Sequence, residues 1–460
     1  MLECYLNMIR IIKKIIPKWF YQVYHYKMAL FGAIFYGFPS RKIKVVGITG
    51  TKGKSTTAEI VNTILEESGF KTALSSTVHF KIGGDEKRNM YKMTMPGRFF
   101  MQKFLNSSVK KRCDWAVIEM TSEGVKQYRH KFIDLDALIV TNISPEHIES
   151  HGSFEKYLNA KLELARSLNK SNKKEKVVVV NRGDKYADDF VSVAKKATPN
   201  YFSINDLELF HLSNDGIIFN FQGEKINSPL LGQFNLENIL AAATFALSIG
   251  ISAEIIARAI NKFKGVRGRV EFIRANEQGT RNPSQIKTRF DGASNKQQNF
   301  DVVVDYAHTI DSLTKLYEAF NPSIPHTGSG SISNKKLICV LGNTGGGRDK
   351  WKRKGMAEVA DKYCDYIILT NEDPYDEDPM EILNQMKEGI KNKPFEIILD
   401  RREAISDALR LASLAQDSNK NNPIVLITGK GTDPYIMGPK SNKTPWDDAT
   451  VAREEFEKFL

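Results

Sequence analysis

The chain has few cysteines: four among its 460 residues, at positions 4, 113, 339 and 364. No two of them stand at the close spacing of a zinc knuckle or of a Cys-x-x-Cys redox motif. This excludes both kinds of cysteine site on spacing, and we expect the protein to work in a reducing cytoplasm.

A long hydrophobic run is also absent. In residues 8–38 basic side chains alternate with aromatic and aliphatic ones, and the longest uncharged run, residues 28–40, is too short to cross a bilayer. No small-residue cleavage site follows, which argues against a secretory signal peptide. We expect residues 1–40 to form an amphipathic segment that packs on the first domain, with peripheral docking on a membrane surface as the alternative.

The third feature that is missing is a concentrated basic stripe. The formal net charge is +12, but Lys and Arg are spread along the whole chain. This distribution argues against nucleic acid as a partner and is typical of a lysine-rich surface.

Short apolar runs separated by helical patterns make up most of the chain. The runs KVVGIT, WAVIEM, ALIVTNI and VVVVN predict a mostly parallel sheet with helices on both faces. Short alternating strands over residues 201–231 and a helix over residues 235–247 follow. The runs VVVDYA, LICVLG, YIILTN, FEIILD and PIVLITG then predict a smaller, Rossmann-like α/β domain. We expect a central domain over residues 41–266 and a C-terminal domain over residues 267–460, with surface insertions near 276–299 and 321–334.

A phosphate-binding loop lies between the first strand and the first helix of the central domain. The string GITGTKGKST fits G-x-x-x-x-G-K-[ST], with Gly47, Gly53, Lys54 and Ser55 in the fixed places. Glycines let backbone N–H groups face phosphates, while the lysine reaches the β/γ oxygens and the hydroxyl binds Mg²⁺. The central domain is thus predicted to be of the P-loop type and to bind ATP. The expected nucleotide contacts are Gly50, Thr51, Lys52, Gly53, Lys54, Ser55 and Thr56.

Acidic and imidazole groups follow the next two predicted strands. One strand ends in Glu119, and the next leads to Ser144-Pro-Glu-His147 and then to His151. Open α/β sheets bind ligands beyond the carboxyl ends of their strands. Glu119 and His147 are therefore candidate metal ligands.

These motifs, with others in the same order, resemble the Mur ligases. The further matches are Ala160-Lys161, Gly232-Gln-Phe-Asn235-Leu-Glu-Asn238, Gly268-Arg269-Val-Glu271, Asp305-Tyr-Ala-His308-Thr309, Gly346-Gly-Arg348-Asp-Lys350 and Gly429-Lys-Gly431. The similarity is greatest to the members that add the third residue of the peptidoglycan stem peptide, and it runs from Lys44 to the C-terminus. It implies a cytoplasmic, monomeric ligase that joins an amino acid to a nucleotide-linked muramoyl peptide through an acyl phosphate.

The resemblance also implies roles for single residues. Lys54 and Ser55 would hold ATP and Mg²⁺, Glu119 and His147 would complete the magnesium sites, and Lys161 would be the family's carbamylated lysine. The residues implied to contact the muramoyl dipeptide are Thr94, Thr121, Gln127 and Arg129. Those implied to contact the nucleotide are Asn235, Asn238, Arg269, Asp305 and His308. Those implied to receive the amino acid are Arg348, Glu372, Asp373, Tyr375, Gly429 and Asp433.

The sequence departs from the family pattern in three places. Residues 1–43 are shorter than the uridine-binding domain that the stem-peptide ligases carry before the loop. Glu372-Asp-Pro-Tyr375 replaces the Asp-Asn-Pro-Arg of the diaminopimelate enzymes, and Asp433 replaces a Glu. An acidic pocket without that Arg predicts lysine or ornithine as the substrate. In the muramoyl-contacting segments Glu123 replaces a His and Met95 a Thr.

Two other functions stay open. Folylpolyglutamate synthase shares the two-domain core and also lacks the uridine-binding domain, but it has a Gly where this chain has Ser55. A non-catalytic Mur-like protein that only binds nucleotide is the second alternative.

Overall fold

The computed structural model describes residues 18–146, 148–213, 216–273, 300–320, 336–415 and 423–458. His147 and the predicted insertions near 276–299 and 321–334 lie outside these residues. The chain divides into two compact units. Unit 1 is Met1–Glu208, Asn220–Ile226 and Leu236–Phe263, and unit 2 is Leu209–Phe219, Asn227–Asn235 and Lys264–Leu460.

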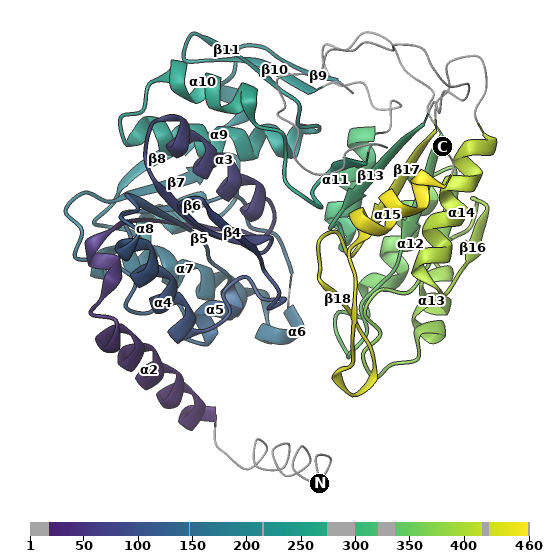
Figure 1. The fold of residues 1–460 in the computed structure, drawn as a ribbon, viewed down its shortest axis with the longest axis horizontal. Coiled ribbons are helices and arrows are strands. Elements are labelled where there is room, and N and C mark those ends of the chain that lie inside the picture. Colours follow the sequence, from purple (N-terminus) through teal and green to yellow (C-terminus); the bar gives the residue numbers. More distant parts are fainter. Residues whose placement is uncertain are drawn as a thin grey trace. The chain divides into compact units, whose positions relative to one another are not determined.

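Unit 1 is built on an eight-stranded, mostly parallel sheet in the order β4-β3-β2-β5-β1-β6-β7-β8 (Figure 1). All neighbouring pairs are parallel except β2–β3 and β3–β4, which are antiparallel. The strands are β1 (Lys44–Thr49), β2 (Thr72–Ser75), β3 (His79–Ile82), β4 (Asp85–Arg88), β5 (Trp115–Glu119), β6 (Ala137–Val140), β7 (Val177–Asn181) and β8 (Thr198–Phe202). The predicted mostly parallel sheet is confirmed, and its antiparallel edge β3–β4 is an addition that the apolar runs did not reveal.

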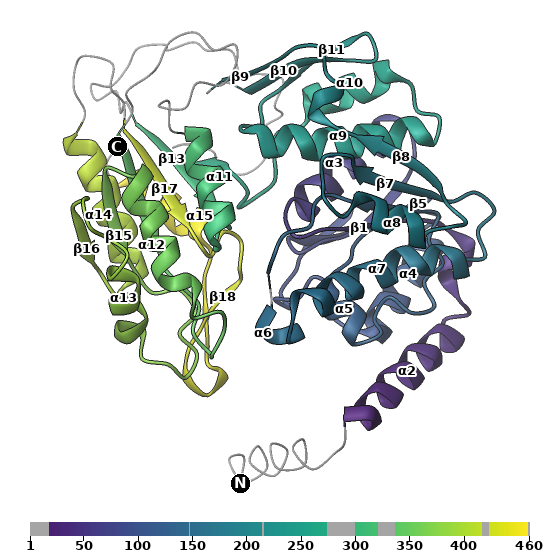
Figure 2. The same cartoon turned by 180° about the vertical axis from the view of Figure 1, so that it is seen from behind.

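Helices cover both faces of this sheet (Figures 1 and 2). On one face Val45, Ala116 and Leu138 pack with the apolar sides of α4, α5, α7 and α8. On the other face Trp115 makes an edge contact with Phe245 of α9 at 5.6 Å between ring centroids. The helices of the unit are α2 (Lys18–Phe35), η1 (Pro39–Lys42), α3 (Lys54–Glu67), α4 (Arg98–Lys110), α5 (Ser122–Lys126), α6 (Ile148–His151), α7 (Phe154–Lys170), α8 (Ala187–Val193), η2 (Ile204–Asp206), α9 (Gln233–Ser248) and α10 (Ala253–Lys262).

The change of pattern after residue 201 corresponds to a small separate sheet. Its strands are β9 (Phe210–Ser213), β10 (Gly216–Phe221) and β11 (Glu224–Ser228), in the order β11-β10-β9. The helix predicted over residues 235–247 is α9, which begins two residues earlier. No helix in the described part of the chain is long and apolar enough to span a membrane.

Unit 2 contains a six-stranded sheet in the order β12-β13-β17-β14-β15-β16, parallel except for β12–β13. Its sheet strands are β12 (Glu271–Ile273), β13 (Asp301–Asp305), β14 (Leu337–Leu341), β15 (Tyr366–Leu369), β16 (Phe395–Ile397) and β17 (Ile424–Thr428), and β18 (Tyr435–Met437) pairs with β19 (Lys443–Pro445). Its helices are α11 (Ile310–Phe320), α12 (Lys352–Tyr363), α13 (Pro379–Lys387), α14 (Arg401–Leu414), η4 (Pro439–Ser441) and α15 (Asp448–Glu457). The predicted second α/β fold is confirmed.

Side chains of the central strands of unit 2 point alternately to the two faces of the sheet, and an apolar core lies on each face. Val303, Cys339 and Leu426 face α11, α12 and α13, whereas Val302 and Val340 face α14 and α15. Successive side chains of a strand point to opposite faces, so a continuous apolar run serves both layers.

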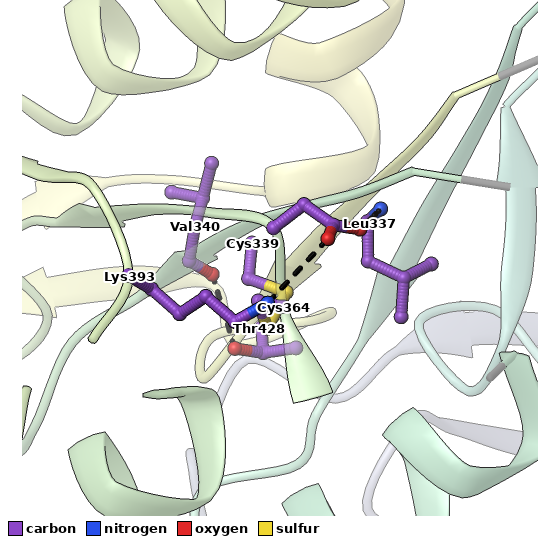
Figure 3. The surroundings of a disulfide bond; sticks show 7 residues. Leu337, Cys339, Val340, Cys364, Lys393 and Thr428 are labelled. Carbon is purple, nitrogen blue, oxygen red and sulfur yellow. Dashed lines mark hydrogen bonds and ion pairs between the residues drawn. A yellow bond between two sulfur atoms is a disulfide. The ribbon is translucent and has the colours of Figure 1, made fainter. Parts of the chain in front are cut away.

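A disulfide joins two of the four cysteines (Figure 3). Cys339 on β14 and Cys364 after α12 are both fully buried, and their Cα atoms are 6.1 Å apart. They are 25 residues apart in sequence, and they meet only because the chain returns beside β14 to begin β15. The sequence spacing gave no sign of this pairing, because the two cysteines are brought together only by the fold.

We expect this bond to stabilise unit 2 measurably. Closing a loop of this length lowers the entropy of the unfolded chain and contributes about 3 kcal/mol to the free energy of unfolding. Guanidinium unfolding of oxidised protein should therefore need more denaturant than the same protein with dithiothreitol. The Cys113→Ala variant should show the same dependence, because that buried thiol is free. Identical curves with and without reductant would contradict the bond.

Candidate functional site

The phosphate loop joins β1 to α3 in unit 1. Gly50 and Gly53 have φ angles of 145° and 82°. A Cβ on Gly50 would clash with Thr141 Oγ1, and one on Gly53 would clash with Asn238 Oδ1. Both positions therefore require glycine for conformation and for space.

Hydrogen bonds from the segment after β6 hold this loop in place. Lys52 N donates to Asn142 Oδ1 at 2.9 Å, and Asn142 Nδ2 donates back to Lys52 O at 3.1 Å. Thr141 Oγ1 donates to Lys52 O at 2.6 Å. Thr51 Oγ1 accepts from Ser144 N at 2.9 Å. The Thr-Asn-x-Ser part of the motif thus braces the phosphate loop through contacts that sequence reasoning had not assigned to it.

The lysines of the loop point to nearby oxygen atoms. Lys54 Nζ donates to Gly50 O at 3.0 Å and to Thr51 O at 2.8 Å. Lys52 Nζ forms an ion pair with Glu146 at 2.7 Å. Ser55, the first residue after Lys54 in α3, is buried. Lys54 therefore curls over the loop, where its amine is placed to reach a phosphate.

Lys161 lies against the same loop although it is far away in sequence. This lysine of α7 is 2% exposed, and its Nζ donates to Gly50 O at 2.6 Å. It lies 4.9 Å from the centroid of the Tyr157 ring, and no ion pair of Lys161 occurs among the described residues. Burial, and next the neighbouring Lys54, hold the pKa of Lys161 well below its ordinary value. The structure thus places a buried amine beside the phosphate loop, in surroundings that disfavour its charged form.

Glu119 lies at the end of β5 and is fully buried. Its carboxylate accepts hydrogen bonds from Thr77 N at 2.9 Å and from Thr77 Oγ1 at 3.0 Å. Thr77 Oγ1 is also 2.9 Å from Thr94 Oγ1. Thr77 therefore links a predicted metal ligand to a predicted acceptor contact, and a single threonine in a loop carries no signal that would have revealed it.

The other predicted acceptor contacts gather near the start of α4. Arg129 Nη2 donates to Gln127 Oε1 at 2.7 Å, and Arg98 Nε donates to Gln127 O at 2.8 Å. Arg98 Nη2 also contacts His25 Nδ1 of α2. No ion pair of either arginine is found in the part of the chain that the structure describes, and each lowers the pKa of His25 after the larger effect of burial. Thr121 stands apart as the N-cap of α5, where it accepts from Gly124 N at 3.1 Å.

The amides of α9 predicted to touch the nucleotide are both buried. Asn235 Nδ2 donates to Leu231 O at 2.8 Å. Asn238 Oδ1 accepts from Thr57 Oγ1 at 3.3 Å and lies against Gly53. Asn238 therefore supports the phosphate loop directly.

In unit 2 the predicted nucleotide contacts surround Tyr306. The Arg269 guanidinium lies 4.3 Å from the centroid of the Tyr306 ring. Asp305 accepts from Val270 N at 2.8 Å, and His308 Nδ1 lies 2.7 Å from Tyr306 O. These contacts fix the turn that carries Arg269.

The three carboxylates of the predicted acidic pocket lie around one buried lysine. Buried Lys430 forms ion pairs with Asp373 at 2.8 Å and with Asp433 at 3.1 Å. Glu372 is buried, accepts from Thr344 through one oxygen, and has a raised pKa, first because of burial and then because of Asp373. A Cβ on Gly429 would meet Glu372 Oε2 at 2.8 Å. Asp373 and Asp433 therefore share one cation partner within the fold. The preference for a distal ammonium stays a prediction that these contacts do not test.

Tyr375 lies beneath a guanidinium group. Its φ is 53°, and Arg348 lies 4.9 Å from the centroid of its ring. Lys350, the other nearby cation, forms an ion pair with Glu377 at 3.1 Å. Arg348 makes no ion pair within the described ranges. Unlike Lys350, it can therefore donate hydrogen bonds to the carboxylate of a ligand.

The side chains around the phosphate loop fit a magnesium-bound nucleotide. Among the described residues no group of three or more His, Cys, Asp or Glu side chains could hold a metal ion. Mg²⁺ is commonly bound through one or two protein oxygens, with water and phosphate completing its shell. Ser55 and Glu119 fit that pattern, and the glycine loop fits the phosphates of ATP.

Comparison with known proteins agrees with both units. Residues 48–246 match the model of the Mur ligase middle domain, and residues 288–431 match that of the Mur ligase, glutamate ligase domain. The UDP-N-acetylmuramoyl-L-alanyl-D-glutamate--2,6-diaminopimelate ligase of Syntrophomonas wolfei is 31% identical over 441 residues, which cover 93% of this chain and 81% of that protein. The UDP-N-acetylmuramyl-tripeptide synthetase of Borreliella burgdorferi is 32% identical over 442 residues, covering 93% and 79%.

A solved structure gives the same result. It is that of a UDP-N-acetylmuramoyl-L-alanyl-D-glutamate--2,6-diaminopimelate ligase, 26% identical, with a TM-score of 0.57 over 91% of this chain and 79% of that one. The matched domains carry the phosphate loop of unit 1 and the strands of unit 2. The chain therefore belongs to the Mur ligase family.

Proposed function

We propose that this protein is an ATP-dependent ligase that adds an amino acid to the carboxylate of a UDP-muramoyl peptide in peptidoglycan biosynthesis, releasing ADP and phosphate. The observation that carries the proposal is the braced phosphate loop with Lys161 against Gly50. The relatives named above are ligases of muramoyl peptides, which favours that acceptor over folate. The proposed enzyme acts as a monomer in the cytoplasm on small molecules.

Mg²⁺ is part of the proposal. Ser55, Glu119, His147 and a carbamylated Lys161 would hold it, and bound MgATP supplies the phosphoryl group that activates the acceptor's carboxylate. Lys161 fits because burial lowers its pKa and so favours the neutral form, which can add to CO₂, forming an N–C bond and releasing a proton. The product carries oxygen atoms, which Mg²⁺ prefers to an ammonium group.

The protein's own residues contribute position and charge. Lys54 would neutralise phosphate oxygens, and the amides of the rigid loop would orient them without reorganisation. Thr77 keeps Glu119 oriented and links it to Thr94. Arg98 and Arg129 offer two guanidinium groups to an anionic acceptor.

The amino acid is proposed to carry a distal carboxylate. Asp373 and Asp433 both pair with Lys430 within the fold, whereas Arg348 over Tyr375 makes no ion pair among the described residues and can bind a ligand's carboxylate. A diaminopimelate-type substrate fits this arrangement better than the lysine or ornithine expected from the sequence.

Phosphate release from ATP tests the proposal, with UDP-muramoyl-dipeptide, folate and a panel of amino acids as substrates. We expect release to require the muramoyl peptide together with an amino acid, and diaminopimelate to exceed lysine in kcat/KM. Arg348→Ala should reduce that preference by about tenfold or more, because a charge-assisted pair contributes about 1.5–3 kcal/mol. Arg410→Ala, at an exposed guanidinium of α14, is the matched control.

Three outcomes would count against parts of the proposal. Release with folate and glutamate would identify the folate activity instead. Nucleotide binding without release under any condition would identify a non-catalytic protein. A preference for lysine that survives Arg348→Ala would contradict the role of Arg348.

A further inference from the structure

Helix α2 exposes an apolar stripe. The side chains of Phe31, Ile34 and Phe35 are 56%, 56% and 66% exposed, and those of Phe20, Val23 and Tyr24 are exposed as well. At 3.6 residues per turn these six positions fall within about 120° of the helix circumference. Lys27 is the one other residue on that arc, and it is exposed too. A contiguous apolar surface of this kind marks a contact with a partner.

The opposite side of α2 already packs on unit 1. Ala29 and Ala33 are buried, and α2 contacts α4. The Tyr26 ring lies 5.4 Å from that of Phe132, and His25 contacts Arg98. Phe31 and Phe35 also touch the Phe99 ring of α4 along one edge of the stripe, at 5.6 and 6.3 Å between ring centroids. More than half of each of these two side chains nevertheless remains exposed.

Charge narrows the choice of partner. Helix α2 contains no acidic residue. Lys27 lies within the stripe, and Lys42 is exposed just beyond the C-terminal end of the helix, next to Arg41, which pairs with Asp134. The sequence before the helix adds Arg10, Lys13 and Lys14. If two copies of the protein associated through this stripe, the cations of one copy would lie near those of the other and repel them. An anionic lipid bilayer instead offers acyl chains to the apolar side chains and negative headgroups to the cations.

We propose that the exposed face of α2 docks on the surface of an anionic lipid bilayer. The helix would lie in the interface with its aromatic and aliphatic side chains among the acyl chains and its cations at the headgroups. The docking would bring unit 1 close to the membrane and leaves the phosphate loop unchanged.

Co-sedimentation with vesicles tests this inference, using the full chain and phosphatidylcholine vesicles with or without phosphatidylglycerol. We expect the wild type to bind anionic vesicles at least tenfold more tightly than neutral ones. Val23→Asp/Ile34→Asp should lose at least tenfold of that affinity, and Lys27→Glu should lose the preference for anionic lipid. Leu209→Asp/Leu414→Asp, which changes two exposed apolar residues away from α2, should bind like the wild type.

Ligase turnover of these variants in solution separates docking from catalysis, since none of the changed residues belongs to the proposed site. Thermal unfolding identifies a variant that fails to fold, and Lys27→Glu, at an exposed position, then carries the test. Equal binding to neutral and anionic vesicles, no binding to either, or unchanged binding by the α2 variants would overturn the proposal. A wild-type dimer that Val23→Asp/Ile34→Asp converts to monomer would also overturn it.

Discussion

Lys54→Ala is expected to abolish ATP hydrolysis, with turnover reduced by at least about 10²–10³-fold. Removing one preorganised group that stabilises developing charge has an effect of this size. The amine of Lys54 lies over the loop on two backbone carbonyls, and alanine leaves nothing to neutralise a phosphate there. Phosphate release under saturating ATP measures the loss.

Ser55→Ala should reduce turnover by a comparable factor, because it removes the hydroxyl that is proposed to bind Mg²⁺. High Mg²⁺ concentrations should restore part of the turnover. Lys44→Ala, at an exposed lysine at the start of β1, is the control and should retain full turnover. Both loop variants should unfold at the temperature of the wild type, because neither side chain belongs to an apolar core. Wild-type turnover in either variant would refute the assignment of the phosphate loop.

Lys161→Ala is the second large effect that we expect. Without the lysine no carbamate can form, so turnover should fall by about 10²-fold or more. A short carboxylate such as acetate or formate should restore part of the activity by occupying the space beside Gly50. Intact-mass analysis of the wild type with and without CO₂ should show the added carboxylate directly.

Lys156→Ala provides the matched control on the same helix, since Lys156 is exposed where Lys161 is buried. It should keep full turnover and should not respond to acetate. An active Lys161→Ala variant would contradict carbamylation. An inactive variant without rescue, together with a wild type that never gains mass, would instead leave Lys161 as a packing residue.

The parts of the site that were predictable are those that lie close together in sequence. The phosphate loop needs glycine at Gly50 and Gly53 for conformation, so its pattern can be read from consecutive residues. The two sheets follow from apolar runs of strand length. Lys161 was assigned by resemblance alone, because a lysine on a helix is normally solvated.

The features that could not be predicted depend on tertiary pairing. Cys339 and Cys364 meet because β14 and β15 are neighbours, and the ion pair of Asp373 depends on where the Lys430 side chain ends. Thr77 reaches Glu119 from a loop that only the fold brings near. Each of these features depends on a contact between residues that are far apart in sequence. Local sequence patterns carry no information about such contacts.

The hydrogen bonds from Thr141 and Asn142 to Lys52 have a thermodynamic consequence for nucleotide binding. Ordering a flexible glycine-rich loop around a ligand costs conformational entropy for every residue that is fixed. Here that cost falls on the folding of unit 1, because the braces do not involve the nucleotide. We therefore expect disorder of the loop to reduce the affinity for ATP little, since the braces stabilise the loop before the nucleotide binds.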